Sequence, residues 1–550
     1  MLWSFALAAL SGSIAALGAS VPTGPSVSTT YGTWKGASAH DVEAFKGIPF
    51  ALPPTGNLRF APPVADNRRH GSFDATHFGY ACGQSSERAG VDPAIATATG
   101  LPDDSAFNSS EDCLSLNVFR PAGTTSSSKL PVMAWIYGGG FLAGNATQYD
   151  PTPILLRSIA LETPVIYVSM NYRLNAFGFL PGTEVAADPS TSVNAGLMDQ
   201  RLALEWIQQN IAAFGGDPKK VTLFGESAGA ISVSLQMLAY GGDITSRYSG
   251  NKLFRAAICE SGAPIPTGPA SYGQYAFDEL TQATNCSGAA DKISCLRKVP
   301  YKQLLDATNT LPGDLSYASV HLPFLPRTDG HFIPDLPPKL VAQHRYAKIP
   351  MISGNQYDEG TIFTISLGNI TTNSQVQEYF SGWFPGVPLS DVSELLSYYP
   401  EDPAQGSPFD TGDLWATTPQ IKRLNAFIGD FAFQSPRRTF VGTTNATQPT
   451  WSYASRVLRG ESALGSYHSS DIPAVYGTDP APPSAELQSR WIAFATTLDP
   501  NVPGYPFWPK YGNNATLLEF KSNATSSIVP DTYRAAALAY ISSKSDTFIL

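Results

Sequence analysis

The chain has 550 residues, of which 43% are apolar and 11% aromatic, so it can bury a large core and is not a disordered protein. Charged residues make up only 15%, and the formal net charge is −10. An acidic chain of this kind binds the phosphate backbone of nucleic acid poorly, so nucleic acid is excluded as an expected partner.

The N-terminus has the features of a secretory signal peptide. The first 34 residues contain no Lys, Arg, Asp or Glu, and their apolar stretch ends in small residues at Gly18–Ser20. The basic residues that usually precede the apolar part are absent. We expect a signal peptide at residues 1–20, a secreted protein, and a single domain over residues 21–550. No other run of ~20 residues is both uncharged and predominantly apolar, as a membrane-spanning helix requires.

Cysteines and glycosylation motifs agree with an extracellular location. Cys259 lies in an apolar run that resembles a buried strand, so we expect it to stay free and the other cysteines to pair by proximity, Cys82 with Cys113 and Cys286 with Cys295. These cysteines form no cluster with histidines that indicates a metal site. Seven N-x-S/T motifs are candidate glycosylation sites, at Asn108, Asn145, Asn285, Asn369, Asn445, Asn514 and Asn523.

Short apolar runs alternate with segments of helical periodicity. The runs expected to be buried strands are Val132–Tyr137, Val165–Met170, Val221–Phe224, Ala256–Cys259 and Ile349–Ser353. Helical spacing is present between the second and third of them, over Asn194–Asn210. This alternation predicts an α/β fold, with a mostly parallel sheet covered by helices on both faces.

A glycine run follows the first of these strands, in Gly138-Gly139-Gly140. Consecutive glycines at the end of a strand can turn several backbone N–H groups toward one point, as an oxyanion hole requires. The simpler interpretation is a flexible turn.

The third strand runs into Gly225-Glu226-Ser227-Ala228-Gly229, and apolar residues at helical spacing follow. This is the pattern G-x-S-x-G between a strand and a helix, which presents a serine nucleophile on a sharp turn. The N-terminus of the helix directs backbone N–H groups at developing negative charge. We therefore expect Ser227 to be a nucleophile rather than part of an ordinary glycine-rich turn.

A serine nucleophile needs a histidine base and an acid that orients it, and on this type of fold the acid precedes the histidine. Ile349–Ser353 is followed by Asp358 and Glu359, and His468 is the one histidine beyond them. The spacing alone does not decide which of the two carboxylates, Asp358 or Glu359, is the acid that orients the histidine.

Two longer segments resemble signatures of the type-B carboxylesterase/lipase family, the cholinesterase-like α/β-hydrolases. They are Glu111–Val118 and Phe224–Gly229. Gln405–Gly412 and Leu498–Asn501 are similar to its fungal branch, which includes Candida-type extracellular lipases and sterol esterases. The resemblance runs from about Tyr31 to the C-terminus. It implies an α/β-hydrolase fold with loop and helical insertions around the site.

The resemblance also implies roles for individual residues, without a cofactor or metal. It selects Glu359 over Asp358 as the acid of a triad with Ser227 and His468. It assigns the oxyanion hole to the amides of Gly139, Gly140 and Ala228, and both cysteine pairs match the family's disulfide loops. Near the triad, Glu226 corresponds to a buried carboxylate that helps to hold the protonated imidazole, and the alternative is a structural hydrogen-bond acceptor. Ser261 corresponds to a serine that supports the acid of the triad.

The implied activity is hydrolysis of a small-molecule or lipid ester through an acyl-enzyme. Lipophilic acylglycerol, sterol or other acyl esters are the first expectation, and soluble aryl or feruloyl-type esters are the alternative. A non-catalytic binding protein on the same fold is a further alternative, although such relatives typically lack the nucleophile. No particular oligomeric state is predicted.

The loop between Cys82 and Cys113 bears on the choice of ester. It contains no Trp or Tyr, so it lacks the cation–π platform that binds choline in cholinesterases. Val91–Gly100 has the cap residues of a short helix with one weakly apolar side. We expect either a lid that makes transient contact with a lipid interface or a static loop. Candidate pocket residues are Phe141, Leu142 and Phe363.

Overall fold

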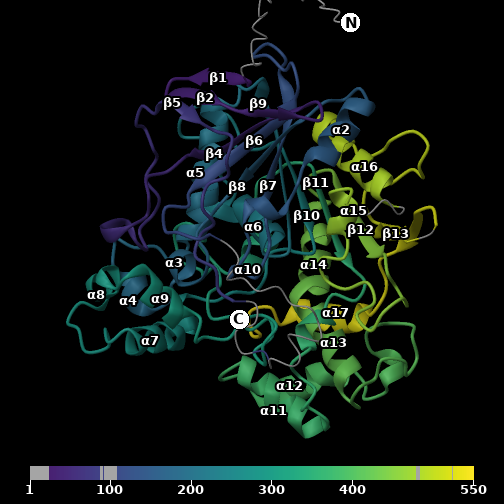
Figure 1. The fold of residues 1–550 in the computed structure, drawn as a ribbon. Helices are drawn as coiled ribbons and strands as arrows, with labels where there is room; N and C mark the ends of the chain where they lie inside the picture. The colour runs from purple at the N-terminus through teal and green to yellow at the C-terminus, as the bar shows by residue number, and fades with distance from the viewer. Residues whose placement is uncertain (1–23, 87–90, 92–107, 479–482, 523) are drawn as a thin grey trace, which may run out of the picture.

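The computed structural model describes residues 24–86, 91, 108–478, 483–522 and 524–550. Through these residues runs an eleven-stranded mixed sheet in the order β14-β13-β12-β11-β10-β9-β7-β8-β6-β4-β3, accompanied by a small sheet in the order β1-β2-β5 (Figure 1). The strands are β1 (Ser26–Thr29), β2 (Gly32–Lys35), β3 (Ala37–Ala39), β4 (Val42–Pro49), β5 (Gly71–Asp74), β6 (Ser115–Pro121), β7 (Leu130–Ile136), β8 (Ile166–Met170), β9 (Gly216–Glu226), β10 (Ala256–Glu260), β11 (Met351–Gln356), β12 (Thr450–Arg456), β13 (Thr516–Lys521) and β14 (Ser527–Pro530).

The centre of the large sheet is parallel, from β8 through β7, β9, β10, β11 and β12 to β13, and its two edges are antiparallel. All five strands expected from the sequence lie in this parallel part, with bounds that differ by up to five residues at either end. Strands buried on both faces need apolar side chains at nearly every position, which is why short apolar runs located them.

Helices cover both faces of this sheet. One group contains α2 and α16, which pack against each other, and α16 lies on β7 and β9. The other contains α5, α6, α10 and α14, of which α6 contacts β7, β9 and β10. Their bounds are α2 (Thr152–Ala160), α5 (Ala195–Asn210), α6 (Ala228–Leu238), α10 (Pro337–Ala342), α14 (Ser435–Thr444) and α16 (Ser484–Thr497). The fold expected from the sequence is confirmed, including the helix over Asn194–Asn210.

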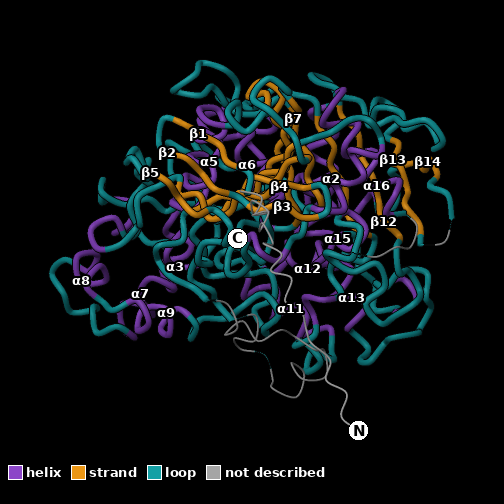
Figure 2. The backbone as a smooth tube through the Cα atoms, turned by 45° about the horizontal axis from the view of Figure 1, so that its top comes forward, coloured by secondary structure: helices purple, strands orange, loops and turns teal. Residues whose placement is uncertain are grey.

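The remaining helices lie mostly beyond one end of the sheet, in the lower half of Figure 2. They are α3 (Asn175–Phe179), α4 (Thr183–Ala187), α7 (Gln274–Ala283), α8 (Lys292–Lys298), α9 (Tyr301–Thr308), α11 (Asn373–Trp383), α12 (Leu389–Ser397), α13 (Ile421–Gly429), α15 (Ile472–Val475) and α17 (Ala535–Ser543). A π-helical turn, Asp430–Gln434, joins α13 to α14. Within the described ranges, no helix combines the length and apolarity needed to cross a bilayer.

Both expected disulfides are present, Cys82–Cys113 and Cys286–Cys295. Cys259 is a free thiol buried in β10, where burial raises its pKa. The first disulfide closes the loop that contains the expected lid helix. That helix, Val91–Gly100, lies outside the described residues except for Val91, as does the expected signal peptide.

Candidate active site

Ser227 occupies the turn between β9 and α6, with φ 57° and ψ −126°. Its backbone N–H donates to the Glu260 carbonyl of the neighbouring strand at 2.9 Å, which holds this uncommon conformation. The flanking glycines are required by close packing. A Cβ at Gly225 would lie 2.6 Å from the Ile136 carbonyl oxygen, and a Cβ at Gly229 only 2.0 Å from it.

His468 connects Ser227 to a carboxylate. Its Nε2 lies 2.7 Å from Ser227 Oγ, and its Nδ1 lies 2.6 Å from Glu359 Oε2. The other oxygen of Glu359 accepts hydrogen bonds from the Gln356 backbone N–H at 2.7 Å and from Asn355 Nδ2 at 3.0 Å. All three side chains of this chain of hydrogen bonds come from loops at the carboxyl ends of central strands, where ligands bind in such sheets.

The two carboxylates that spacing left equivalent have different partners. Asp358 Oδ1 accepts from Ser407 Oγ and the Phe409 N–H, both at 2.8 Å, and Oδ2 accepts from the Ser466 N–H at 3.0 Å. Asp358 therefore fixes the loop that presents His468, whereas Glu359 contacts the imidazole itself. Burial raises the pKa of Asp358.

A second carboxylate, Glu226, lies beside the imidazole. Its Oε1 is 3.5 Å from His468 Nε2 and accepts a hydrogen bond from Ser469 Oγ at 2.6 Å. Burial raises the pKa of Glu226 to about 7. Burial alone would lower the pKa of His468, but the charges of Glu359 and Glu226 outweigh it and raise that pKa to about 9. The site is therefore built to stabilise an imidazolium.

Ser261, the serine that the resemblance places near the acid, makes no direct hydrogen bond to Glu359. Its hydroxyl is buried and makes no hydrogen bond, while its N–H donates to the Gly354 carbonyl at 2.8 Å. Glu359 instead receives its support from Gln356 and Asn355. Support of the acid by Ser261 therefore stays a prediction from the family resemblance.

The glycine run forms a loop next to Ser227. Gly139 and Gly140 have φ angles of 98° and 61°, and a Cβ at Gly138 would lie 2.8 Å from Ser227 Cβ. In the described part of the chain, no hydrogen bond takes up the N–H of Gly139, Gly140 or Ala228. Three donors next to the serine are thus available to a negatively charged oxygen.

Sequence reasoning missed the side chain that fixes this loop, Gln84. Its Oε1 accepts from the Gly144 N–H at 2.7 Å, and its Nε2 donates to the carbonyls of Gly144 at 3.0 Å and Cys82 at 2.7 Å. The Ser85 N–H also donates to the Leu142 carbonyl at 2.8 Å. The base of the disulfide loop is therefore joined directly to the glycine loop. Only the position of Gln84 two residues after Cys82 could have pointed to it.

An apolar pocket adjoins Ser227. Of the expected pocket residues, Phe141 and Phe363 line it, and Leu142 does not. Phe433, which the sequence did not suggest, packs its ring 4.5 Å from that of His468. Further lining residues are Ile231, Ile265, Val320, Leu322, Leu325 and Leu550. The volume, about 50 Å³, is well below the ~300–1,000 Å³ typical of ligand pockets, so wall side chains must move to admit a long acyl chain.

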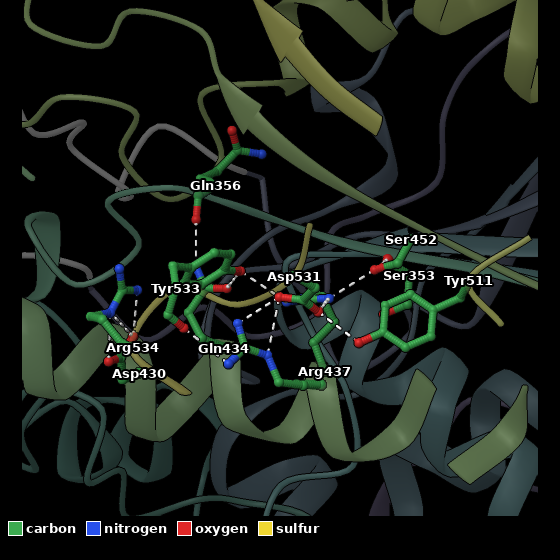
Figure 3. Close-up of polar contacts among 11 residues, drawn as sticks. Ser353, Gln356, Asp430, Gln434, Arg437, Ser452, Tyr511, Asp531, Tyr533 and Arg534 are labelled. Carbon is green, nitrogen blue, oxygen red and sulfur yellow. Dashed lines mark hydrogen bonds and ion pairs between the residues drawn. The ribbon is translucent and has the colours of Figure 1, made fainter. Parts of the chain in front are cut away.

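A network of buried polar side chains, drawn in Figure 3, leads from an ion pair to Gln356, the residue whose N–H holds Glu359. Gln434 Nε2 donates to the Gln356 carbonyl at 2.7 Å, and Gln356 in turn holds Glu359 through its N–H. Gln434 Oε1 accepts from Tyr533 OH at 2.7 Å, and Tyr533 accepts from Arg437 at 2.8 Å. The network thus extends from Glu359 to a buried ion pair between Arg437 and Asp531.

The glycosylation candidates differ in accessibility. Asn145 is fully buried, and its side chain caps a short helix by accepting from Thr147, so a glycan there is incompatible with this fold. Asn445 is half-buried and donates to two backbone carbonyls. Asn108, Asn285, Asn369 and Asn514 are exposed, and Asn523 lies outside the described residues.

The arrangement suits attack of an activated hydroxyl on a carbonyl carbon. A base contacts the hydroxyl, a carboxylate holds the base, and three N–H groups are available for the oxyanion. Among the described residues, no group of three or more His, Cys, Asp or Glu side chains is arranged as a metal site.

Comparisons with known proteins agree with this geometry. The family model described as "Carboxylesterase family" matches residues 23–541. "Secreted lipase 1" of Botryotinia fuckeliana is 44% identical over 94% of this chain and 92% of its own. "Lipase 4" of Diutina rugosa is 43% identical over 90% and 91%. The crystal structure of Aspergillus niger EstA superimposes with a TM-score of 0.80 at 28% identity, covering 96% of this chain and 99% of that one.

Proposed function

The chain belongs to the carboxylesterase family and is a carboxylic ester hydrolase, and we propose that it cleaves lipophilic esters through an acyl-enzyme formed on Ser227. The observation that carries this proposal is the continuous hydrogen-bonding path from Ser227 through His468 to Glu359, next to three available N–H groups. Supporting evidence for the substrate class is the apolar lining of the adjoining pocket.

In the first half-reaction, His468 Nε2 accepts the Ser227 proton as Oγ attacks the ester carbonyl. The N–H groups of Gly139, Gly140 and Ala228 stabilise the tetrahedral oxyanion. The imidazolium then donates its proton to the leaving alcohol. In the second half-reaction, His468 activates water, which releases the acid and restores Ser227. Glu359 holds the imidazole in the tautomer with a proton on Nδ1 and stabilises its charged form.

We expect Glu226 to influence the pH dependence of kcat/KM, because its charge raises the pKa of His468. The base must be neutral to accept the Ser227 proton, so kcat/KM should rise with pH until His468 is deprotonated, near pH 9. Glu226→Gln removes a charge 3.5 Å from Nε2, which lowers the pKa of His468. The acidic limb of the kcat/KM profile should therefore move about one pH unit or more toward acid.

The matched control is Glu205→Gln, because Glu205 is an equally buried carboxylate whose partners are Ser246 and Arg247. Its profile should coincide with that of the wild type. A Glu226→Gln limb that stays in place, or moves toward alkaline pH, would show that Glu226 does not act on the imidazole.

The pocket and the relatives support the proposed preference for lipophilic esters. Three apolar side chains, Phe363, Val320 and Leu322, line the space beside Ser227, and both relatives described above are named as lipases. Initial rates on p-nitrophenyl esters from acetate to palmitate, with triolein, a sterol oleate and methyl ferulate alongside, test this. We expect kcat/KM to rise with acyl length. A preference for acetate or methyl ferulate would support the alternative, an esterase for soluble esters.

The proposal includes an extracellular location. The absence of charged residues from the first 34 positions supports it, and so does the name of the relative from Botryotinia fuckeliana, a secreted lipase. Cleavage near residue 20 is the expected processing step, and N-terminal sequencing of protein collected from culture medium measures it directly.

A further inference from the structure

Two buried carboxyl groups close to the triad have no part in the proposed mechanism, Glu260 and Asp471. Glu260 is the last residue of β10, and its backbone carbonyl accepts a hydrogen bond from the Ser227 N–H at 2.9 Å. Asp471 lies three positions after His468, on the loop that carries this histidine. Both side chains are fully buried. The two groups therefore belong to the segments that hold the nucleophile and the base.

Each of these carboxyl groups has one oxygen with a partner and one without. Glu260 Oε1 accepts from Trp491 Nε1 at 2.6 Å, and Asp471 Oδ2 accepts from Tyr453 OH at 3.1 Å. Glu260 Oε2 and Asp471 Oδ1 are buried and make no hydrogen bond to the described residues. No Lys or Arg side chain in the described ranges forms an ion pair with either group. A carboxylate in such a place is costly, and taking up a proton removes that cost.

The other charged groups of this region add to the cost. Burial raises the pKa of Glu260 well above its usual value, and the charges of Asp471 and Glu226 raise it further. His468 is the base of the region, and its nitrogens lie 2.6 Å from Glu359 and 3.5 Å from Glu226. One imidazolium cannot neutralise four buried carboxylates, so at least one of the four acids carries a proton.

The remaining titratable groups that interact with Glu260 supply no positive charge. They are tyrosines and a thiol, and burial raises the pKa of each, so all are neutral: Tyr167, Tyr453, Tyr476 and Cys259. Asp471 differs from Glu260 because its pKa is raised only to about 6, chiefly by burial and then by the charge of Glu359. At the pH at which His468 acts as a base, Asp471 is therefore ionised.

We propose that Glu260 is a neutral carboxylic acid in the active enzyme, with its proton on Oε2, and that this proton limits the negative charge around His468. Oε1 accepts from Trp491, which leaves Oε2 as the oxygen that carries the proton. Glu260 is then a positioning residue, because it acts on the base through charge and does not touch the ester. Its effect on His468 rests on the proposed function, whereas its protonation does not.

A buried neutral acid makes stability depend on pH with a definite sign. In the unfolded chain Glu260 has the ordinary pKa of ~4.3. In the folded chain its pKa is raised by burial. Between the two values the unfolded chain releases a proton that the folded chain keeps, so stability falls as pH rises. For each pH unit in this interval, Glu260 shifts the equilibrium toward unfolding by a factor of about ten.

Glu260→Gln tests this directly, because the amide has the same shape and cannot ionise. Equilibrium urea unfolding of the wild type and the variant between about pH 5 and pH 8 should give a ratio of unfolding constants, wild type over variant, that grows about tenfold per pH unit. The matched control is Glu486→Gln. Glu486 is equally part of the interior but is paired with Arg490 at 2.8 Å, so its ratio should not grow with pH.

Infrared difference spectroscopy observes the proton itself. The carbonyl stretch of a protonated carboxyl group is separate from the bands of carboxylates. The spectrum of the wild type minus that of Glu260→Gln, both at neutral pH, should therefore contain one carboxylic acid band.

The pH profile of kcat/KM tests the effect on the base. In Glu260→Gln the acidic limb should stay at the wild-type pH, because no charge has been removed. In Asp471→Asn it should move toward acid, because the charge of Asp471 raises the pKa of His468. A limb that moves toward acid in Glu260→Gln would show that Glu260 is ionised. A limb that stays in place in Asp471→Asn would show that charges in this cluster do not act on the base.

Two outcomes would overturn the assignment of the proton. They are a ratio of unfolding constants that is independent of pH in Glu260→Gln, and an infrared difference without a carboxylic acid band. Neither measurement uses an ester, so failure of either leaves the proposed function intact. Conversely, absence of ester hydrolysis would reject the proposed function without affecting the protonation of Glu260.

Discussion

Ser227→Ala is expected to lower kcat on p-nitrophenyl esters by roughly 10⁶-fold, as removal of the nucleophile does in serine hydrolases whose triad acts as a unit. The alanine cannot form the acyl-enzyme, and water attacking in its place lacks the 2.7 Å hydrogen bond that aligns Oγ with His468. The residual rate should come from the three N–H groups and from substrate binding, so KM should change little.

The control is Ser234→Ala, which removes a fully buried hydroxyl from α6. Ser234 Oγ donates to the Ile231 carbonyl of its own helix and lies on no path to His468. Its kcat should stay within a few-fold of the wild type. Turnover near the wild-type level in a folded Ser227→Ala protein would contradict the proposed mechanism.

Asp531→Asn is expected to destabilise the protein by about 3–5 kcal/mol, because it leaves the buried charge of Arg437 without its partner. Arg437 is fully buried, with Nη1 2.9 Å from Asp531 Oδ2, and Tyr511 OH donates to the same oxygen at 2.8 Å (Figure 3). Urea unfolding followed by tryptophan fluorescence measures the loss as a lower midpoint.

The pH dependence of stability provides a second measurement of this ion pair. Burial alone would raise the pKa of Asp531, but Arg437 and Arg438 outweigh it and lower that pKa to about 2. A depressed carboxyl pKa stabilises the fold above the unfolded value of ~3.9, and this contribution is lost as pH falls toward 2. In the Asp531→Asn variant, the free energy of unfolding should therefore change less than in the wild type as the pH falls from ~3.9 toward 2.

The control for Asp531 is an ion pair in solvent. Lys302 and Asp306 form an i,i+4 pair whose side chains are 84% and 59% exposed. Solvent screening limits such a pair to about 0–1 kcal/mol, so Asp306→Asn should hardly change the midpoint. Equal effects of the two substitutions would show that the Asp531 network does not stabilise the core.

The sequence predicted the central strands because burial on both faces imposes an uninterrupted apolar pattern. β12 (Thr450–Arg456) lacks that pattern, since Ser452 and Ser455 interrupt its aromatic residues. In the structure, Ser452 Oγ donates to the Ser353 carbonyl and accepts from Arg437, so polar residues are accommodated in this strand by specific partners. Such partners are distant in sequence, and periodicity does not reveal them.

The residues of the candidate site also fall into those that the sequence could locate and those that it could not. Ser227 and His468 could be located from a local motif and from chain order, whereas the choice between Asp358 and Glu359 needed the family resemblance. The structure gives the physical difference, since the Asp358 carboxylate accepts hydrogen bonds from Ser407 and Ser466 and does not contact the imidazole. Gln84 and Phe433 were missed because each acts across the fold, on the glycine loop and on the imidazole.

The measurement that tests the central claim most directly is covalent labelling with a fluorophosphonate, followed by peptide mapping. The account predicts one adduct per molecule, on the peptide that contains Ser227, with esterase activity lost in proportion to labelling. Labelling should slow by orders of magnitude in His468→Ala, because the hydroxyl is no longer activated. An adduct on a different residue, or full esterase activity in protein labelled at Ser227, would contradict the account.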